Sequence, residues 1–300
     1  MESSNNTASP ASNSLAAIPE HKTSSLLLKL PQETKNQIYE LVCGGQFLHI
    51  TKDLRLLSNH ICRAKTSEDQ AQEEFDTGLR SEWNAADEIN PHIHCKPGKK
   101  DEQNLSISIL LSCRQAYNEA RLLPYSTNTF SFGEPRVLLS FIAKAMQSGA
   151  SLATRSVHLH MFIKRDTDVD AWRRALRLVS KELTGLQNVY IMMDQGFEPA
   201  RHVGYVAQHY RRLDHDEFAK LDERWWTSLL ASLDKLQKLP LKKATFVISD
   251  KGLEVPWGKF VYWQIYQQSE MAYRWTLEEK RAWSKDVRQV ILRQKSSSVA

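Results

Sequence analysis

The sequence is poor in cysteine and has no long apolar run, and each shortage excludes a class of protein. Its 300 residues include four cysteines, which lie far apart at Cys43, Cys62, Cys95 and Cys113. Without a CxxC pair or a regular spacing they indicate reduced thiols, so we expect a cytoplasmic or nuclear protein. No stretch approaches the roughly 18 apolar residues of a membrane span, and no basic, apolar leader is present. We therefore expect a soluble chain with no membrane partner.

Motifs of the common enzyme classes are also missing. The chain has no GxSxG, HExxH or GxxxxGK[ST] motif, which would indicate a nucleophilic serine, a catalytic zinc or a phosphate-binding loop. Asp214, His215 and Asp216 are adjacent, and neighbours in sequence rarely converge on one proton. Their place before an expected helix suits capping instead. We therefore expect no catalytic residue, no cofactor and no enzymatic activity.

Histidine and cysteine gather in two short stretches, and both residue types bind zinc. His60 and Cys62 lie in the first stretch, and His92, His94 and Cys95 lie in the second. The spacing fits no standard zinc module, and the adjacent His94 and Cys95 suit a single tetrahedral site poorly. We therefore predict a polar loop with incidental histidines and no metal.

The overall composition is that of an ordinary globular protein, with 41% hydrophobic and 25% charged residues. The net charge of +5 is mild, so it permits an acidic partner without requiring one. One expected helix carries a basic ridge, formed by Arg173, Arg174, Arg177 and Lys181. A solvated helix face is the usual meaning of such a pattern. Nucleic-acid binding through these basic faces is nevertheless the alternative function.

The chain divides into three parts by composition and periodicity. Residues 1–24 are polar and aperiodic and predict a disordered tail. Residues 25–125 hold helical patterns, at 31–43 and 108–122, separated by a short strand at 47–51 and by an exposed polar insertion at about 64–104. Residues 126–300 alternate expected strands with helices and end in a long helix.

This alternation predicts a mixed α/β fold. Strands are expected at 128–132, 156–163, 188–193 and 244–249, and helices at 134–147, 168–183, 217–238 and 269–294. Units of about 30 residues with one strand and one helix imply parallel strands joined by right-handed crossovers. An irregular leucine-rich-repeat-like array is one architecture with this property. A conventional doubly wound sheet is the other.

The most specific stretch is LLLKLPQETKNQIYEL at residues 26–41. Proline suits the start of a helix, and Ile38, Leu41 and Val42 then fall at i, i+3 and i+4 on one apolar stripe. Such a stripe either docks in a partner groove or packs on the chain's own core. The candidate docking residues are the four in this stretch and one tryptophan beside a later leucine stripe: Leu30, Pro31, Ile38, Leu41 and Trp226.

Together with ILLSCRQAYNEARLLPYSTNTFSF at residues 109–132, this stretch resembles a large fungal family of F-box-like proteins of unknown function. The resemblance covers about residues 26–165. It implies an F-box-like N-terminal module that binds a Skp1-type adaptor, while the C-terminal part presents an unidentified protein substrate to a cullin ubiquitin ligase. The sequence departs from a standard F-box because a strand and the polar insertion follow its first helix. We therefore expect a non-catalytic interaction or adaptor protein.

Overall fold

The computed structural model describes residues 26–53, 56–64, 66–77, 92, 95, 105–163, 166–195, 228–249 and 277–292. The helices and strands have the following bounds: η1 (Leu26–Lys29), α1 (Gln32–Cys43), β1 (Phe47–Asp53), β2 (Leu56–Ile61), α2 (Glu68–Thr77), α4 (Ser108–Ser112), α5 (Arg114–Ala120), α6 (Leu123–Thr127), β3 (Thr129–Phe132), α7 (Pro135–Ser148), β4 (Ser156–Ile163), α8 (Asp166–Glu182), β5 (Asn188–Gln195), η2 (Asp234–Lys238), β6 (Lys243–Ser249) and α12 (Leu277–Leu292). Residues 228–233 are also helical and run into η2.

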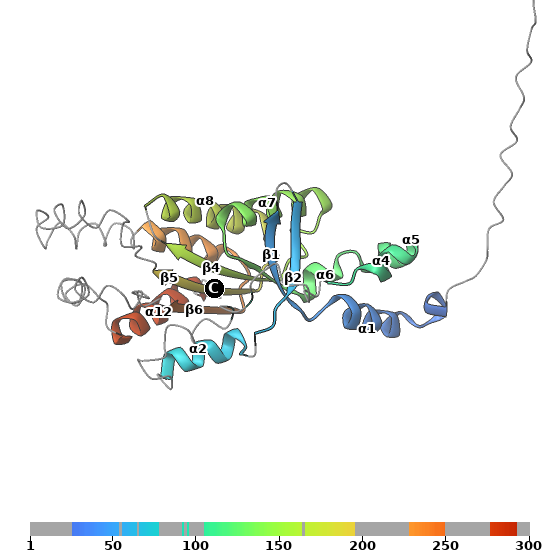
Figure 1. The fold of residues 1–300 in the computed structure, drawn as a ribbon, viewed down its shortest axis with the longest axis horizontal. Coiled ribbons are helices and arrows are strands. Elements are labelled where there is room, and N and C mark those ends of the chain that lie inside the picture. Colours follow the sequence, from blue (N-terminus) through green and yellow to red (C-terminus); the bar gives the residue numbers. More distant parts are fainter. Residues whose placement is uncertain are drawn as a thin grey trace, which may run out of the picture.

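A single six-stranded sheet in the order β2-β1-β3-β4-β5-β6 forms the centre of the molecule (Figure 1). Only the β1–β2 pair is antiparallel, and the other neighbours are parallel. The mixed α/β prediction is therefore confirmed. From β3 to β6 the strands lie side by side in chain order, whereas the order in a doubly wound sheet reverses at a switch point. The doubly wound alternative is therefore wrong.

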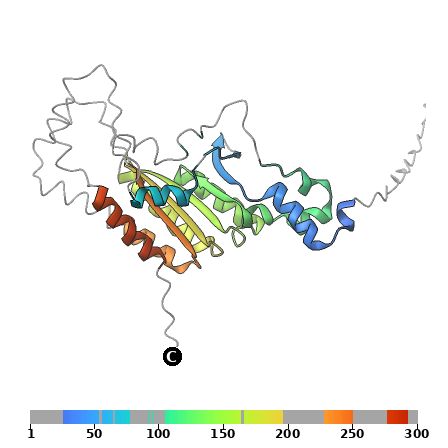
Figure 2. The same ribbon diagram turned by 90° about the horizontal axis from the view of Figure 1, so that it is seen from below.

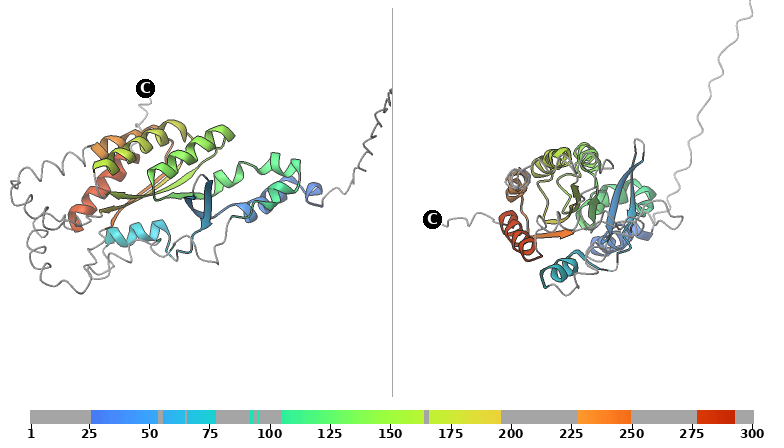
Figure 3. Two further views of the ribbon diagram at one scale, coloured as in Figure 1. Left: turned by 45° about the horizontal axis from the view of Figure 1, so that its top comes forward. Right: turned by 60° about the vertical axis from the view of Figure 1, so that its left-hand side comes forward.

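Helices cover both faces of this sheet (Figure 3). The helices α7 and α8 lie together on one face, and α2 lies on the other face, next to β6 (Figure 2). The helix α12 packs along β6 and adds Val287 and Ile291 to the main core. Because both faces are covered, strands such as β4 are buried almost throughout, as parallel strands usually are. None of the helices in these ranges is long and apolar enough to cross a membrane.

The N-terminal helices form a second, smaller unit, which we call the N-terminal helical module (η1, α1, α4, α5 and α6). It projects from the side of the sheet at which β1 and β3 begin (Figures 1 and 2). Its core is separate from that of the sheet and contains Tyr39, Cys43, Leu110, Ala116 and Ala120. Residues 47–61, in contrast, contribute β1 and β2 to the main sheet.

The expected elements of the α/β part agree well with the structure. The strands expected at 128–132, 156–163, 188–193 and 244–249 correspond to β3, β4, β5 and β6, and the helices at 134–147 and 168–183 correspond to α7 and α8. The helix expected at 217–238 is α-helical over 228–233 and continues as the 3-10 helix η2, and the helix expected at 269–294 corresponds to α12. Residues 217–227, 269–276 and 293–294 lie outside the described ranges.

Three local expectations were wrong. The helix expected over 108–122 breaks at Cys113, whose extended backbone (φ −159°, ψ 160°) caps α5, and a separate helix, α6, follows from Leu123 with Pro124 in its first turn. The strand β2 was not expected. The expected exposed insertion at about 64–104 includes α2, and this helix is not exposed, because Ala71 and Phe75 are buried and the side-chain oxygen of Gln72 accepts a hydrogen bond from Phe246 N at 2.6 Å.

Candidate functional site

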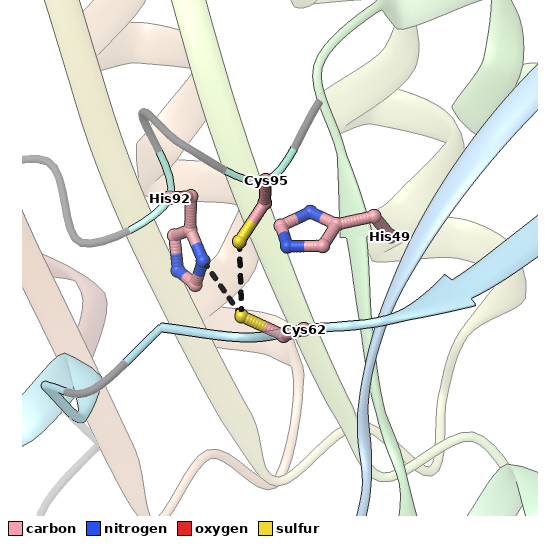
Figure 4. A group of neighbouring side chains, drawn as sticks. All are labelled: His49, Cys62, His92 and Cys95. Carbon is pink, nitrogen blue, oxygen red and sulfur yellow. Dashed lines mark hydrogen bonds between the residues drawn. The ribbon is translucent and has the colours of Figure 1, made fainter. Parts of the chain in front are cut away.

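Two histidines and two cysteines from three separate segments meet beside the paired strands β1 and β2 (Figure 4). His49 lies on β1, and Cys62 follows the last residue of β2. The antiparallel register places His49 opposite His60, and side chains two residues apart share a face of a strand, so Cys62 lies on the same face as His49. The other two members, His92 and Cys95, lie between α2 and α4. Strand pairing thus preorganises one half of this Cys/His cluster.

The distances within the Cys/His cluster are short. Cys62 Sγ lies 3.1 Å from His92 Nδ1 and 3.6 Å from Cys95 Sγ. One ligand atom from each of the four residues lies within 4.8 Å of all the others. The two sulfurs are too far apart for a disulfide, whose S–S bond is about 2.05 Å long. A backbone hydrogen bond of 2.9 Å from Cys95 N to His92 O forms a turn, which directs both side chains to one point.

A carboxylate fixes the orientation of His92. Its Nε2 atom lies 2.5 Å from Glu68 Oε1, so Nδ1 is the nitrogen that faces the sulfurs. Glu68 is the first residue of α2 and is buried. The His92 ring also stacks on Phe47, with 4.5 Å between ring centroids. Burial of α2 against the sheet therefore positions the histidine.

The protonation of the Cys/His cluster is unusual. The hydrogen bond between the two thiol groups lowers the pKa of Cys95 far below its ordinary value and raises that of Cys62, so the pair shares one proton. Burial lowers the pKa of His92, but its contacts with Cys95 and Glu68 outweigh this, so its pKa is raised. Burial also lowers the pKa of His49, which favours the neutral imidazole. The cluster thus holds a thiolate beside a neutral imidazole.

A second chain of polar groups leads from Glu68 into the sheet. Glu68 Oε2 lies 3.6 Å from His158 Nε2, and His158 Nδ1 lies 2.9 Å from Ser131 Oγ. These are the residue types of a hydrolase triad. However, Ser131 is only 4% exposed and His158 only 1% exposed, so a substrate cannot reach the hydroxyl. The chain is a buried polar network rather than a nucleophilic site.

The structure brings together some of the histidines and cysteines considered from the sequence. Cys62, His92 and Cys95 do meet, so they form a cluster and are not incidental residues of a polar loop, whereas the expected absence of a metal stays a prediction. His60 is not among the four residues and instead stacks on His49, with 4.9 Å between ring centroids, and His94 lies outside the described residues. Sequence reasoning missed His49. It also passed over the two-residue spacing between His92 and Cys95, which is typical of zinc ligand pairs.

The expected docking residues of α1 have different environments. Leu30 and Ile38 are half-buried, Pro31 is exposed and Leu41 is 83% exposed. Trp226 lies outside the described residues. The proline caps α1, which begins at Gln32.

The stripe of Ile38, Leu41 and Val42 is not the face of α1 that packs on the protein. The buried residues of this helix are Lys35, Tyr39 and Cys43, spaced four apart. Packing on the chain's own core was one of the two roles predicted for the stripe. Leu41 and Val42 do not have this role, because both side chains are exposed.

A polar contact explains which face of α1 is buried. Lys35 Nζ lies 2.9 Å from Glu119 Oε1 on α5, and the hydroxyl of Tyr39 donates to Glu119 Oε2 at 3.1 Å. Burial and the contact with Glu119 raise the pKa of Tyr39 to about 12, so the phenol keeps its proton. Hydrogen bonds from Gln115 and Lys35 lower the pKa of Glu119. A charged pair thus joins helices that are far apart in sequence.

Exposed apolar side chains are concentrated on the N-terminal helical module. Six large ones lie on it or just before α4: Leu41, Val42, Ile107, Leu111, Tyr117 and Leu122. In the rest of the described ranges, only Leu56, Met146 and Leu152 are similarly exposed. A surface hollow of about 490 Å³ lies at the C-terminal end of α1, lined by Gln37, Glu40, Leu41, Gly44, Gly45 and Gln46.

The basic ridge of α8 lies on an exposed helix face, and two of its four cations are paired. Arg173 contacts Asp170 at 2.9 Å and Lys181 contacts Glu182 at 3.1 Å. Such pairing reduces the positive charge available to a phosphate backbone. The nucleic-acid alternative therefore gains no specific support. Asp214, His215 and Asp216 lie outside the described residues.

Comparison with known proteins identifies a family but no activity. The family model described as a domain of unknown function (DUF7730) matches residues 20–208. No curated protein and no solved structure matches the chain. The matched range includes the N-terminal helical module, all four residues of the Cys/His cluster and the strands β1 to β5.

Proposed function

The chain belongs to the DUF7730 family, whose function is unknown, and we propose that it is a non-catalytic interaction protein. It docks one partner protein through the exposed apolar side chains of its N-terminal helical module. The partner is a Skp1-type adaptor, and the chain acts as an F-box-like substrate receptor. The concentration of exposed apolar side chains on this one module is the observation that supports the proposal most directly.

Folding does not require the outward face of α1. The inward face already has a full set of partners, because Tyr39 and Cys43 are buried in the module core and Lys35 is paired with Glu119. Leu41 adds nothing to that core. A leucine that is 83% exposed leaves apolar surface in water, and burying such a side chain contributes about 1.5–3 kcal/mol. Binding of a partner would recover this free energy.

The form of the surface suits a protein partner rather than a small molecule. The exposed leucines and the tyrosine project from short helices, and an amphipathic helix commonly places such side chains in an apolar groove of its partner. The module also extends beyond the sheet, so the sheet does not obstruct access to it (Figure 2).

The resemblance to F-box-like proteins supports a Skp1-type adaptor as the partner. It assigns α1 to the first F-box helix and the region of α4 and α5 to the third. The structure places α5 beside α1 through the contact between Lys35 and Glu119, although 84 residues separate the two. Two helices that the sequence separates thus form one unit, and this supports the proposed role of the module in docking.

Binding of the full-length chain to a purified Skp1-type adaptor tests the proposal. We expect measurable binding of the wild type and a loss of at least about tenfold in affinity for Leu41→Asp. In the complex, this substitution removes the contact of the leucine with the partner and buries an unpaired carboxylate in the interface. Leu152→Asp is the matched control: Leu152 is 64% exposed but lies outside the module, so this variant should bind like the wild type.

Circular dichroism of the variants separates docking from folding. Leu41 is solvent-exposed, so the free energy of unfolding of Leu41→Asp should lie within about 0.5 kcal/mol of that of the wild type. If the wild type does not bind the adaptor, or if Leu41→Asp and Leu152→Asp bind equally well, the adaptor proposal is wrong.

A further inference from the structure

The Cys/His cluster contains a complete ligand set for one metal ion. Two thiols and two imidazoles make up the Cys₂His₂ set of structural zinc sites, which are four-coordinate and tetrahedral. Thiolates and imidazoles select zinc over magnesium or calcium, which prefer oxygen ligands. We propose that His49, Cys62, His92 and Cys95 bind one Zn²⁺ ion and that this ion has a structural role.

The observed distances suit a tetrahedron. With Zn–S bonds of about 2.3 Å and Zn–N bonds of about 2.05 Å, two sulfur ligands lie about 3.8 Å apart and a sulfur and a nitrogen about 3.6 Å apart. The sulfurs of Cys62 and Cys95 are 3.6 Å apart, and Cys62 Sγ is 3.1 Å from His92 Nδ1. Both distances lie within about 0.5 Å of these tetrahedral values, and every other pair of ligand atoms in the cluster lies within 4.8 Å.

The second nitrogen of His92 is held as in known zinc sites. A histidine that binds a metal through one nitrogen usually donates its other N–H to a carboxylate, which fixes the tautomer and the ring orientation. The contact between His92 Nε2 and the buried Glu68 provides this arrangement. Glu68 is therefore a positioning residue for the proposed site and not a ligand.

His49 supplies an independent observation. Its Nε2 atom is buried and has no hydrogen-bond partner among the described residues, although a buried polar atom without a partner costs about 1–3 kcal/mol. The ring points towards the two sulfurs (Figure 4). A metal ion at the centre of the cluster would satisfy this nitrogen.

The sulfur of Cys62 has the environment of a thiolate ligand. The backbone N–H of Ala64 donates a hydrogen bond to Cys62 Sγ at 3.2 Å, and hydrogen bonds of this kind stabilise ligands of a metal. Both sulfurs would coordinate Zn²⁺ as thiolates, so binding of the ion depends on pH.

The ion would join parts of the chain that the sheet alone does not hold together. The ligands come from β1, from the end of β2 and from the turn at 92–95, and Glu68 connects the same turn to α2. The structural role follows from the complete ligand set, because a catalytic zinc keeps one position open for water or substrate. Binding free energy at such a site contributes to folding free energy.

Metal analysis of the purified full-length chain is the first test. We expect one zinc per chain in the wild type and a loss of that zinc in Cys62→Ser and in Cys95→Ser. Cys113→Ser is the matched control, because its thiol caps α5 by accepting from Ala116 N and serine is also a good helix cap. This variant should keep its zinc.

Cobalt titration keeps the test decisive if the cysteine variants fail to fold. One equivalent of Co²⁺ added to metal-free wild type should produce the strong visible bands of tetrahedral cobalt and a thiolate-to-metal charge-transfer band, and Zn²⁺ should abolish both. In addition, Glu68→Gln should still bind one ion but about 10–100-fold more weakly.

Two results would overturn the proposal. One is the absence of both stoichiometric zinc and a cobalt spectrum in folded wild type. The other is a disulfide between Cys62 and Cys95 that forms even with zinc present. To test for it, the protein is isolated under reducing conditions, exposed to air with zinc present and analysed by mass spectrometry. Neither result affects the adaptor proposal, because the docking surface and the Cys/His cluster share no residue.

Discussion

Replacing Asn128 should loosen the junction between the N-terminal helical module and the sheet. Asn128 is fully buried between α6 and β3, directly before the strand begins. Its Nδ2 donates to Cys43 O at 2.6 Å and to Pro124 O at 2.8 Å, and its Oδ1 accepts from Gln46 N at 2.7 Å. One side chain therefore provides hydrogen-bond partners for backbone groups at the end of α1, in the first turn of α6 and just before β1.

The expected loss is large because three buried backbone groups depend on one amide. Leaving a buried donor or acceptor without a partner costs about 1–3 kcal/mol. Asn128→Ala removes the partner of all three groups, although water entering the new space would satisfy some of them. We therefore expect the free energy of unfolding to fall by about 3–5 kcal/mol, below the simple sum of these costs.

Urea denaturation followed by tryptophan fluorescence and circular dichroism measures this loss. Asn128→Asp is an informative second variant: it keeps the acceptor for Gln46 N but places a carboxylate against the carbonyls of Cys43 and Pro124, so it should be destabilised at least as much as Asn128→Ala. Ser126→Ala, two residues earlier, is the control and should cost less than about 1 kcal/mol, because it removes a single hydrogen bond. A loss below about 1 kcal/mol for Asn128→Ala would refute the assignment of this residue as the junction.

Three further predictions concern the same regions. Hydrogen bonds from Gln115 and Lys35 lower the pKa of Glu119, so these contacts stabilise the fold above the ordinary pKa of 4.5, and the stabilisation is lost as pH falls through the lower pKa of the folded state. Glu119→Gln should therefore be less stable than the wild type at neutral pH, and the difference between their melting midpoints should shrink as the pH is lowered. Gly44→Ala should destabilise the chain by about 1–3 kcal/mol in thermal melts, because a Cβ atom there would lie 2.6 Å from Thr127 Oγ1; an unchanged midpoint would contradict this steric reasoning. A strong chelator should lower the melting midpoint of the wild type but leave that of Cys62→Ser unchanged, and an equal effect on both would show that the stabilising metal does not bind through Cys62.

The two proposals assign different roles to different parts of the chain. The docking surface lies on helices whose outward face the fold does not use. The Cys/His cluster lies where β1 and β2 meet the turn at 92–95, and its polar atoms face one another. Zinc would make the β1–β2 edge and α2 rigid, while the N-terminal helical module remains available to a partner.

The regular elements of the α/β part could be predicted from sequence because their signals are local. Val169, Trp172, Leu176, Val179 and Leu183 recur at helical spacing, and all five are buried in the α8 region. The alternation in SVHLHMFI likewise predicts β4 with the bounds that it has in the structure. Because one strand and one helix fit in about 30 residues, parallel crossovers were also predictable.

The broken helix and the missed strand had weaker local signals. Residues 108–122 keep a helical apolar spacing across Cys113, but the thiol can cap the following helix, and this alternative backbone conformation prevailed. The strand β2 contains few β-branched residues and is stabilised by pairing with β1. Tertiary contacts thus overrode local preference in both segments.

The sequence by itself determined the secondary structure of most of the described residues, the parallel α/β class and the presence of an amphipathic first helix, because side-chain periodicity depends only on neighbours in the chain. Only the tertiary structure decided which face of α1 is buried, since Lys35 finds its partner in Glu119, 84 residues later. The same holds for the Cys/His cluster. Cys62 and Cys95 are 33 residues apart in sequence, and their meeting with His49 depends on the register of β1 with β2 and on the packing of α2, which no local pattern encodes.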